Sequence, residues 1–364
     1  MPTVLSQLEL NAELEEAATM TQTRFVDGVR DLGYVLDTTL VDLDQADGFL
    51  GRENVLGRIN YTTVAAGPVV AAGHPVLDLH MARTPGDAFS EVWTTHGKVV
   101  TGEHEGLVFG HDGEFLFVAG SVPEGARYAA ATERAYLNTL GLLRDLGYPR
   151  CYRMWNFVSR INEDNADGLE NYRDFCLGRA TALEKTGFNE TDIPAATGIG
   201  SLGGGVAFYV LSSRSVTPTA IENPQQMSAY HYPRRYGPKA PKFARATHLG
   251  ARAVGPSARI YVSGTASITG HVSRHTGDVV RQTHLALENI TRLIGASNLG
   301  EHGVGDGYFL SNLNHIKVYV RHAADIETVR RICGQAFAPS AEIRYLNVDV
   351  CRSDLLVEIE GIAY

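Results

Sequence analysis

Two buried strands with the same pattern occur in different parts of the chain, at residues 115–120 and 259–264, and each ends in glycine. After a polar loop, each strand is followed by a stretch whose apolar positions return every three or four residues, which is typical of an amphipathic helix. In the first copy these positions are Tyr136, Leu140 and Leu143, and in the second they are Val279, Thr283, Ala286 and Ile290. The pattern therefore predicts the same strand and helix twice.

The similarity continues through three further elements in the same order. A strand at 151–158 corresponds to one at 315–320, and a second helical pattern follows both. Residues 199–210 then correspond to 350–361 as a closing strand. Such a repeat indicates a duplicated unit, and helices that return to one face of a sheet define the α+β class. We therefore predict an α+β fold of two fused units, each a mixed sheet with helices on one face.

The repeat also predicts the domain organisation. We expect a helical lead-in and an edge strand at 1–49, a first unit at 50–213, a linker rich in Tyr, Arg and Pro at 214–239, and a second unit at 240–364. The linker contains Tyr230-His-Tyr-Pro-Arg-Arg-Tyr236, which is an unusual composition for an inert connector.

Composition and charge exclude several classes of function. The 364 residues carry a formal net charge of −9, which disfavours a nucleic-acid partner, because phosphate binding depends on clustered positive charge. No apolar run approaches the ~20 residues that a membrane-spanning helix needs, and the first 16 residues do not resemble a secretory signal. We therefore expect a cytoplasmic enzyme with a small-molecule substrate and no membrane partner. Its four cysteines form no CxxC pair and are expected to be reduced thiols, three of them buried.

Comparing the two copies identifies a candidate acid. Gly200 and Ala207 of the first copy align without a gap with Cys351 and Glu358 of the second. Alternation along the last strand places Glu358 and Glu360 on one face. A carboxylate on a central strand is costly to bury unless it is paired or protonated. It could form an ion pair with Arg344 or Arg352, or it could be a proton donor whose pocket raises its pKa.

The second copy resembles the RidA/YjgF family. The matching segments are Tyr261-Val-Ser-Gly264, Gln282-Thr-His-Leu-Ala-Leu-Glu-Asn-Ile290 and Val357-Glu-Ile-Glu360. In that family the first glutamate of the last motif acts on a catalytic water, and this position falls on Glu358. An upstream arginine of the family holds the substrate carboxylate, and Arg344 is the nearest match, displaced by one residue.

From about residue 51 to the end, the chain is similar to the chorismatases, which are two-unit relatives with the same fold. The motifs that carry this resemblance are Arg153-Met-Trp-Asn156, Ala195-Ala-Thr-Gly-Ile-Gly-Ser201 with Gly203-Gly-Gly205, Tyr230-His-Tyr-Pro-Arg-Arg-Tyr-Gly237, Phe243-Ala-Arg245, Ser263-Gly-Thr-Ala-Ser267 and Val350-Cys-Arg-Ser-Asp-Leu-Leu-Val-Glu-Ile-Glu360. The resemblance implies that the second unit is catalytic and the first is not.

The resemblance also implies a reaction. Chorismatases remove pyruvate from chorismate without a metal or an organic cofactor, and their three branches give a dihydroxycyclohexadiene carboxylate, 3-hydroxybenzoate or a mixture of hydroxybenzoates. Gly264 and Cys351 stand where the 3-hydroxybenzoate branch has glycine and cysteine. Glu358 would protonate the methylene of the enol ether, and an intramolecular, arene oxide-type step would follow. The alternatives are the hydrolytic branch, an imine or enamine hydrolase, and a ligand-binding protein without catalysis.

Chorismate carries two carboxylates, which need guanidinium or hydroxyl partners. The candidates for substrate binding are Arg153, Arg245, Tyr236, Arg235 and Arg344, in that order, because Arg153 lies inside an otherwise apolar strand. No metal site is expected, since His271 and His275 have no evident third ligand. The glycine-rich segment 198–205 lacks the ending of a phosphate-binding loop and predicts a bend. The oligomeric state is expected to be a monomer or a small homo-oligomer.

Overall fold

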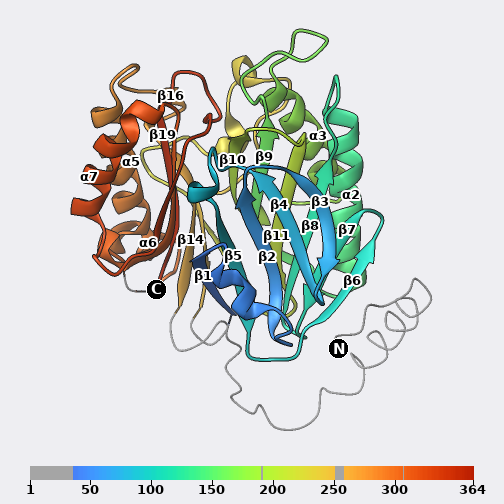
Figure 1. Ribbon diagram of the computed structural model, residues 1–364. Coiled ribbons are helices and arrows are strands. Elements are labelled where there is room, and N and C mark those ends of the chain that lie inside the picture. Colours follow the sequence, from blue (N-terminus) through green and yellow to red (C-terminus); the bar gives the residue numbers. More distant parts are fainter. Residues whose placement is uncertain (1–35, 190–191, 251–257, 306) are drawn as a thin grey trace.

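The computed structural model describes residues 36–189, 192–250, 258–305 and 307–364, and they form three sheets around a shared core (Figure 1). The helix predicted in the lead-in 1–49 lies outside the described residues, apart from a short turn of 3-10 helix at Gln45–Phe49. Among the described residues, none of the helices has the length and apolarity needed to cross a membrane.

The first sheet is built from the N-terminal part of the described chain. Its strand order is β1-β5-β2-β4-β3, so that β1 and β3 are its edge strands. The strand bounds are β1 Leu36–Asp42, β2 Val55–Thr62, β3 Ala66–Ala71, β4 His74–His80 and β5 Phe89–Thr95. The range 50–213 thus contains most of a sheet of its own before the duplicated unit begins.

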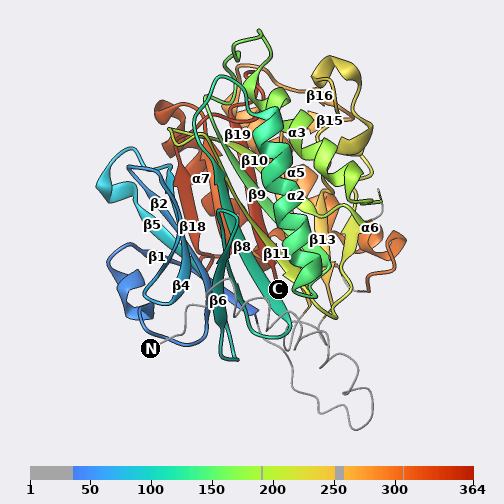
Figure 2. The same ribbon diagram turned by 90° about the vertical axis from the view of Figure 1, so that its right-hand side faces the viewer.

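The second sheet is mixed, in the order β10-β9-β11-β8-β7-β6, with β10 parallel to β9 and the other pairs antiparallel. Its helices α2 (Ala129–Asp145) and α3 (Asn171–Lys185) cover its outer face (Figure 2). The strand bounds are β6 Val100–His104, β7 Leu107–His111, β8 Phe115–Val122, β9 Arg150–Ser159, β10 Ala195–Ser201 and β11 Val206–Ser213.

The third sheet repeats this plan in the order β12-β13-β14-β19-β17-β18, with β18 parallel to β17. Helices α5 (Val279–Ile294), α6 (Ala296–Glu301) and α7 (Ile326–Ala336) belong to this unit, and α5 and α7 cover the outer face of its sheet (Figure 1). The strand bounds are β12 Thr219–Ile221, β13 Ala246–Leu249, β14 Arg259–Ala266, β17 Leu313–Val320, β18 Ile343–Leu346 and β19 Val357–Ala363, with a small hairpin of β15 Ile268–Thr269 and β16 Val272–Ser273.

The predicted α+β fold with two units, each a mixed sheet with helices on one face, is confirmed. The two predicted closing strands differ from the structure: the one at 350–361 begins only at Val357, as β19, and the one at 199–210 is two strands, β10 and β11. The chain reverses between them at Gly204 and Gly205, whose φ angles of 92° and 75° favour glycine. Periodicity cannot separate two short apolar strands joined by so tight a turn.

The inner faces of the three sheets share one core rich in aromatic side chains. Trp155 stacks on Tyr209 with ring centroids 4.4 Å apart, and Tyr61 stacks on Phe89 at 4.3 Å. The two units also join directly, because β10 bridges to Ala244 and to Val350. The edge of the second sheet therefore lies against the strands of the third, and the candidate acid stands beside this junction.

Candidate active site

Glu358 lies on β19, in the middle of the third sheet, opposite Ala266 on one neighbouring strand and Tyr319 on the other. Its side chain is buried, with 3% of the residue exposed. It lines a cavity of about 300 Å³ formed by both units and by the segment between them. Glu170 and Asp354 also line this cavity, but of the three carboxyl groups only that of Glu358 is buried.

Both copies and the linker contribute to the wall of this cavity. The first unit supplies Glu170, Tyr172, Arg173, Ala196 and Gly198; the segment 232–245 supplies Tyr232, Tyr236, Pro241, Phe243 and Arg245; the second unit supplies Gly264, Ala266, Ile268, Cys351, Arg352, Ser353, Asp354 and Glu358. Aromatic rings and three arginines thus surround one buried acid. Such a site suits a small anionic ligand with an unsaturated ring.

Burial raises the pKa of Glu358 to about 8, and the nearby charge of Glu360 acts in the same direction. The thiol of Cys351, with Sγ 3.7 Å from Oε2, opposes this increase, and so do the charges of Arg245 and Arg153. The ion pair with Arg344 or Arg352 that the sequence left open is not formed in the described structure, because both guanidinium groups bond elsewhere. At neutral pH the carboxyl is therefore mainly protonated, as a general acid must be.

Gly264 and Cys351 both contact the candidate acid. A Cβ added to Gly264 would lie 1.9 Å from Oε1 of Glu358, so any side chain here would displace the carboxyl. Burial raises the pKa of the Cys351 thiol well above its usual value, and the charge of Glu358 is the second largest cause of this increase. Cys351 is consequently a neutral thiol in the wall beside the acid, and the two positions together define where the carboxyl stands.

Two of the predicted substrate-binding residues line the cavity. Arg245 is buried, donates to the carbonyl of Met227 and to the hydroxyl of Tyr232, both at 2.8 Å, and has no hydrogen-bond partner for its Nε among the described residues. Tyr236 donates to the carbonyl of His271 at 2.6 Å. Arg235 does not line the cavity; its exposed side chain bonds to the Tyr236 hydroxyl at 3.2 Å from outside.

The structure does not bring Arg153 or Arg344 into the cavity. Arg153 is 1% exposed, and its guanidinium pairs at 2.5 Å with Glu360, two residues along β19 from Glu358. Arg344 lies on β18 and pairs with Asp42 of β1 at 2.8 Å. An internal carboxylate, and not a ligand, explains why Arg153 stands in an apolar strand. Neither residue is therefore placed at the substrate.

The sequence analysis missed several residues of the wall, above all Arg352. Its guanidinium lies 4.1 Å from the centre of the Tyr236 ring and donates to the carbonyl of His271 and to Ser273. Tyr172, Tyr232 and Phe243 were also missed as site residues. The signal was present for three of these four, since Arg352, Tyr232 and Phe243 stand within the motifs quoted for the chorismatase resemblance.

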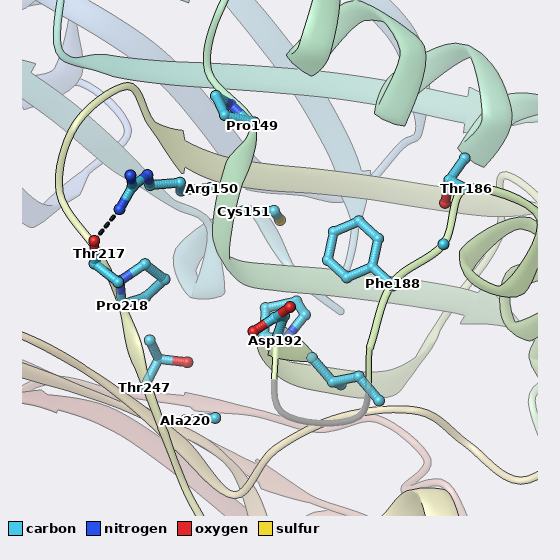
Figure 3. A pocket seen from close by; sticks show the side chains of 13 residues that line it. Pro149, Arg150, Cys151, Thr186, Phe188, Asp192, Thr217, Pro218, Ala220 and Thr247 are labelled. Carbon is cyan, nitrogen blue, oxygen red and sulfur yellow. Dashed lines mark hydrogen bonds between the residues drawn. The ribbon is translucent and has the colours of Figure 1, made fainter.

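Two other cavities are lined by acidic residues, but none of these residues is buried as Glu358 is. One of about 370 Å³, at the start of β9, is lined by Arg150, Cys151, Phe188 and Asp192, among other residues, and Figure 3 shows Arg150 bonded to Thr217 across its edge. Another of about 310 Å³ contains Ala207, which occupies the place of Glu358 in the first unit. None of the predicted site residues lines either cavity.

Other features of the described residues bear on cofactors. Cys151, Cys176 and Cys333 are buried free thiols, as expected, and Cys351 is partly exposed and free. The part of the chain that the structure describes contains no group of three or more His, Cys, Asp or Glu side chains arranged to hold a metal ion.

Comparison with known proteins identifies the family. A family model described as "Chorismatase FkbO/Hyg5-like, N-terminal" matches residues 91–212. A "3-hydroxybenzoate synthase" of Streptomyces hygroscopicus is 52% identical over 86% of this chain and 92% of that protein, and a "Chorismatase" of Streptomyces rapamycinicus is 46% identical over 86% and 93%. A crystal structure of a chorismatase, 42% identical, covers 91% of this chain and 98% of its own with a TM-score of 0.86. The chain belongs to the chorismatase family.

Proposed function

We propose that this protein cleaves chorismate to 3-hydroxybenzoate and pyruvate without a metal or an organic cofactor. The observation that carries the proposal is the buried Glu358, which faces a cavity lined by three arginines and has its pKa raised to about 8. The relative named 3-hydroxybenzoate synthase, at 52% identity, supports the same reaction.

The first step is protonation of the terminal methylene of the enol ether by Glu358. This gives an oxocarbenium ion and weakens the bond between the ether oxygen and the ring. The carboxylate left on Glu358 stabilises the positive charge at close range. A carboxyl that was ionised beforehand could not start this reaction.

The second step decides the product. The neighbouring ring hydroxyl attacks the ring carbon that carries the ether, and the bond from that carbon to the ether oxygen breaks, so that this oxygen leaves as the ketone oxygen of pyruvate. The proton of the hydroxyl returns to the Glu358 carboxylate, and the resulting arene oxide opens and aromatises to 3-hydroxybenzoate. If water attacked the oxocarbenium carbon instead, a hemiketal would collapse to pyruvate and a ring diol. Gly264 and Cys351 favour the first outcome, because both shape the space beside Glu358.

Changing Gly264 to alanine is expected to alter the product ratio more than substrate binding. The added methyl group would lie 1.9 Å from Oε1 of Glu358 and would force the carboxyl to move, whereas the arginines would stay in place. A change of about 1.4 kcal/mol between the two competing barriers raises the share of the diol about tenfold. Chromatography of the products measures this share, with Cys351→Ala as a second variant. An unchanged product profile in both variants would contradict the role of these positions.

The carboxylates of chorismate bind to Arg245 and Arg352 in this proposal, with Tyr236 as a further donor. Arg245→Gln is expected to raise KM by about 10- to 100-fold, since a hydrogen bond to a charged group is worth roughly 1.5–3 kcal/mol. Arg344→Gln is the matched control, because Arg344 lies outside the cavity in a partly exposed pair with Asp42. Steady-state kinetics of both variants test the assignment. An equal effect of the two changes would refute it.

A direct assay tests the function. Purified protein is mixed with chorismate, pyruvate is followed through a coupled reaction, and the second product is identified by chromatography. Pyruvate together with 3-hydroxybenzoate is the expected result. Absence of pyruvate would exclude chorismate cleavage, and pyruvate with a non-aromatic diol would assign the protein to the hydrolytic branch. We further propose a reducing, cytoplasmic compartment, which suits four free thiols.

A further inference from the structure

Four charged side chains meet at the centre of the molecule, and we call them the central charge network: Glu91, Arg153, Lys317 and Glu360. Each is at most 3% exposed. Lys317 lies 2.6 Å from Glu91 and 3.1 Å from Glu360, and Arg153 lies 2.5 Å from Glu360. Because β5, β9, β17 and β19 supply these residues, the network joins all three sheets, and its four charges sum to zero.

Glu360 is the most heavily bonded member of the network. Besides Lys317 and Arg153, its oxygens accept hydrogen bonds from Trp155 at 3.0 Å and from Tyr319 at 2.7 Å. Burial opposes ionisation of Glu360, but the two cations and its hydrogen bonds hold its pKa below the usual value. A permanent negative charge therefore stands two residues along the strand from Glu358.

Thr197 connects this charge to the wall of the cavity. Its hydroxyl donates to Glu360, accepts from Arg153 at 2.7 Å and accepts from the backbone N–H of Gly264 at 3.0 Å. A hydroxyl offers one hydrogen and two lone pairs, so its bonding capacity is filled. Thr197 belongs to the first unit and Gly264 to the second. One hydroxyl thus fixes the strand segment against which the Glu358 carboxyl rests.

We propose that Glu360 and Thr197 are a pair of positioning residues, which fix the location of the Glu358 carboxyl and keep it neutral. Buried ion pairs contribute little net stability compared with apolar residues of the same size. A network of four buried charges is therefore poorly explained by folding alone. Glu360 lies two residues along β19 from Glu358, the buried acid of the cavity, and this place gives the network a task. Its relevance to turnover rests on the proposed function.

Other groups also act on Glu358 and must be distinguished from this pair. The charged or titratable groups around it are Glu360 on its own strand, Cys351 in the preceding loop, Arg245 before β13, Arg153 on β9 and Tyr172 on α3. Of these, the hydrogen bond from Cys351 and the charges of Arg245 and Arg153 favour ionisation of Glu358, whereas the charge of Glu360 opposes it. Removing Glu360 should therefore lower the pH at which Glu358 loses its proton.

The test compares two double variants, each of which removes one positive and one negative charge. The first variant combines Lys317→Met with Glu360→Gln and removes the carboxylate near Glu358. The second combines Lys317→Met with Glu91→Gln and removes the other carboxylate that pairs with Lys317. The carboxyl stretch of Glu358 is titrated by infrared difference spectroscopy against the same background carrying Glu358→Gln. This readout needs no substrate, so it stands even if chorismate is not cleaved.

The first double variant is expected to titrate about one pH unit below the wild type, and the second close to it. Thr197→Val should lower kcat about tenfold with little change in KM, and Thr197→Ser, which keeps the hydroxyl, should restore it. Equal midpoints in the wild type and the Glu360 double variant would overturn the proposed role of Glu360. A folded Thr197→Val protein with the kcat of the wild type would overturn the proposed role of Thr197. Circular dichroism confirms folding in each case.

Discussion

Replacing Glu358 with glutamine is expected to lower kcat by about a thousandfold, within the roughly 10²–10⁴ that general acids contribute. Glutamine has nearly the same size and shape, so it fits beside Gly264 and Cys351 without displacing either. It cannot give up a proton to the methylene of the enol ether, however, and it cannot become the carboxylate that stabilises the oxocarbenium ion. Release of pyruvate from chorismate measures the loss, and KM should stay within a fewfold of wild type.

A matched control is Glu301→Gln at the exposed end of α6, which should leave kcat unchanged. The melting profile of both variants should resemble that of the wild type, since neither change removes a packed apolar group. If folded Glu358→Gln protein retained the wild-type rate, the acid would have to lie elsewhere in the molecule.

The pH dependence of turnover is the second large effect. Glu358 has a pKa of about 8 and must be protonated to act. The value of kcat should therefore be nearly constant on the acidic side of that pKa, and it should fall about tenfold per pH unit well above pH 8. A fall of kcat with rising pH is the mark of an acid, because a group that served as a base would make kcat rise with pH instead.

Turnover in a series of buffers, with substrate above KM at each pH, measures this profile. A kcat that rises with pH through the neutral range would show that the ionised carboxylate is the active form. The same profile recorded for Cys351→Ala separates the thiol from the acid: the falling limb should remain, because burial and the charge of Glu360, which raise the pKa of Glu358, are both kept.

The duplicated units could be predicted because strand and helix periodicities are local signals that survive divergence. The separate first sheet could not. Its strands fall partly within the range 50–213, and their pairing joins β1 to β5 and β2 to β4 across the intervening chain. Which strands share a sheet depends on contacts distant in sequence, and no local pattern records them.

The candidate acid was predictable because one copy serves as a control for the other: Ala207 stands where the second unit has Glu358. The arginines were harder to assign. A guanidinium in an apolar strand needs an anion, but the sequence does not say whether that anion is a ligand or, as for Arg153, an internal carboxylate. Arg352 was read only as a possible partner of Glu358, although it lies in the wall of the cavity.

The protonation state of one side chain can be measured without following the reaction at all. In an infrared difference spectrum between wild-type protein and Glu358→Gln, a neutral carboxyl group should be visible at pH 7 and should disappear with a midpoint near pH 8. A carboxylate signal throughout the range from pH 5 to pH 9 would mean that Glu358 has no proton to give, and the proposed mechanism would be wrong.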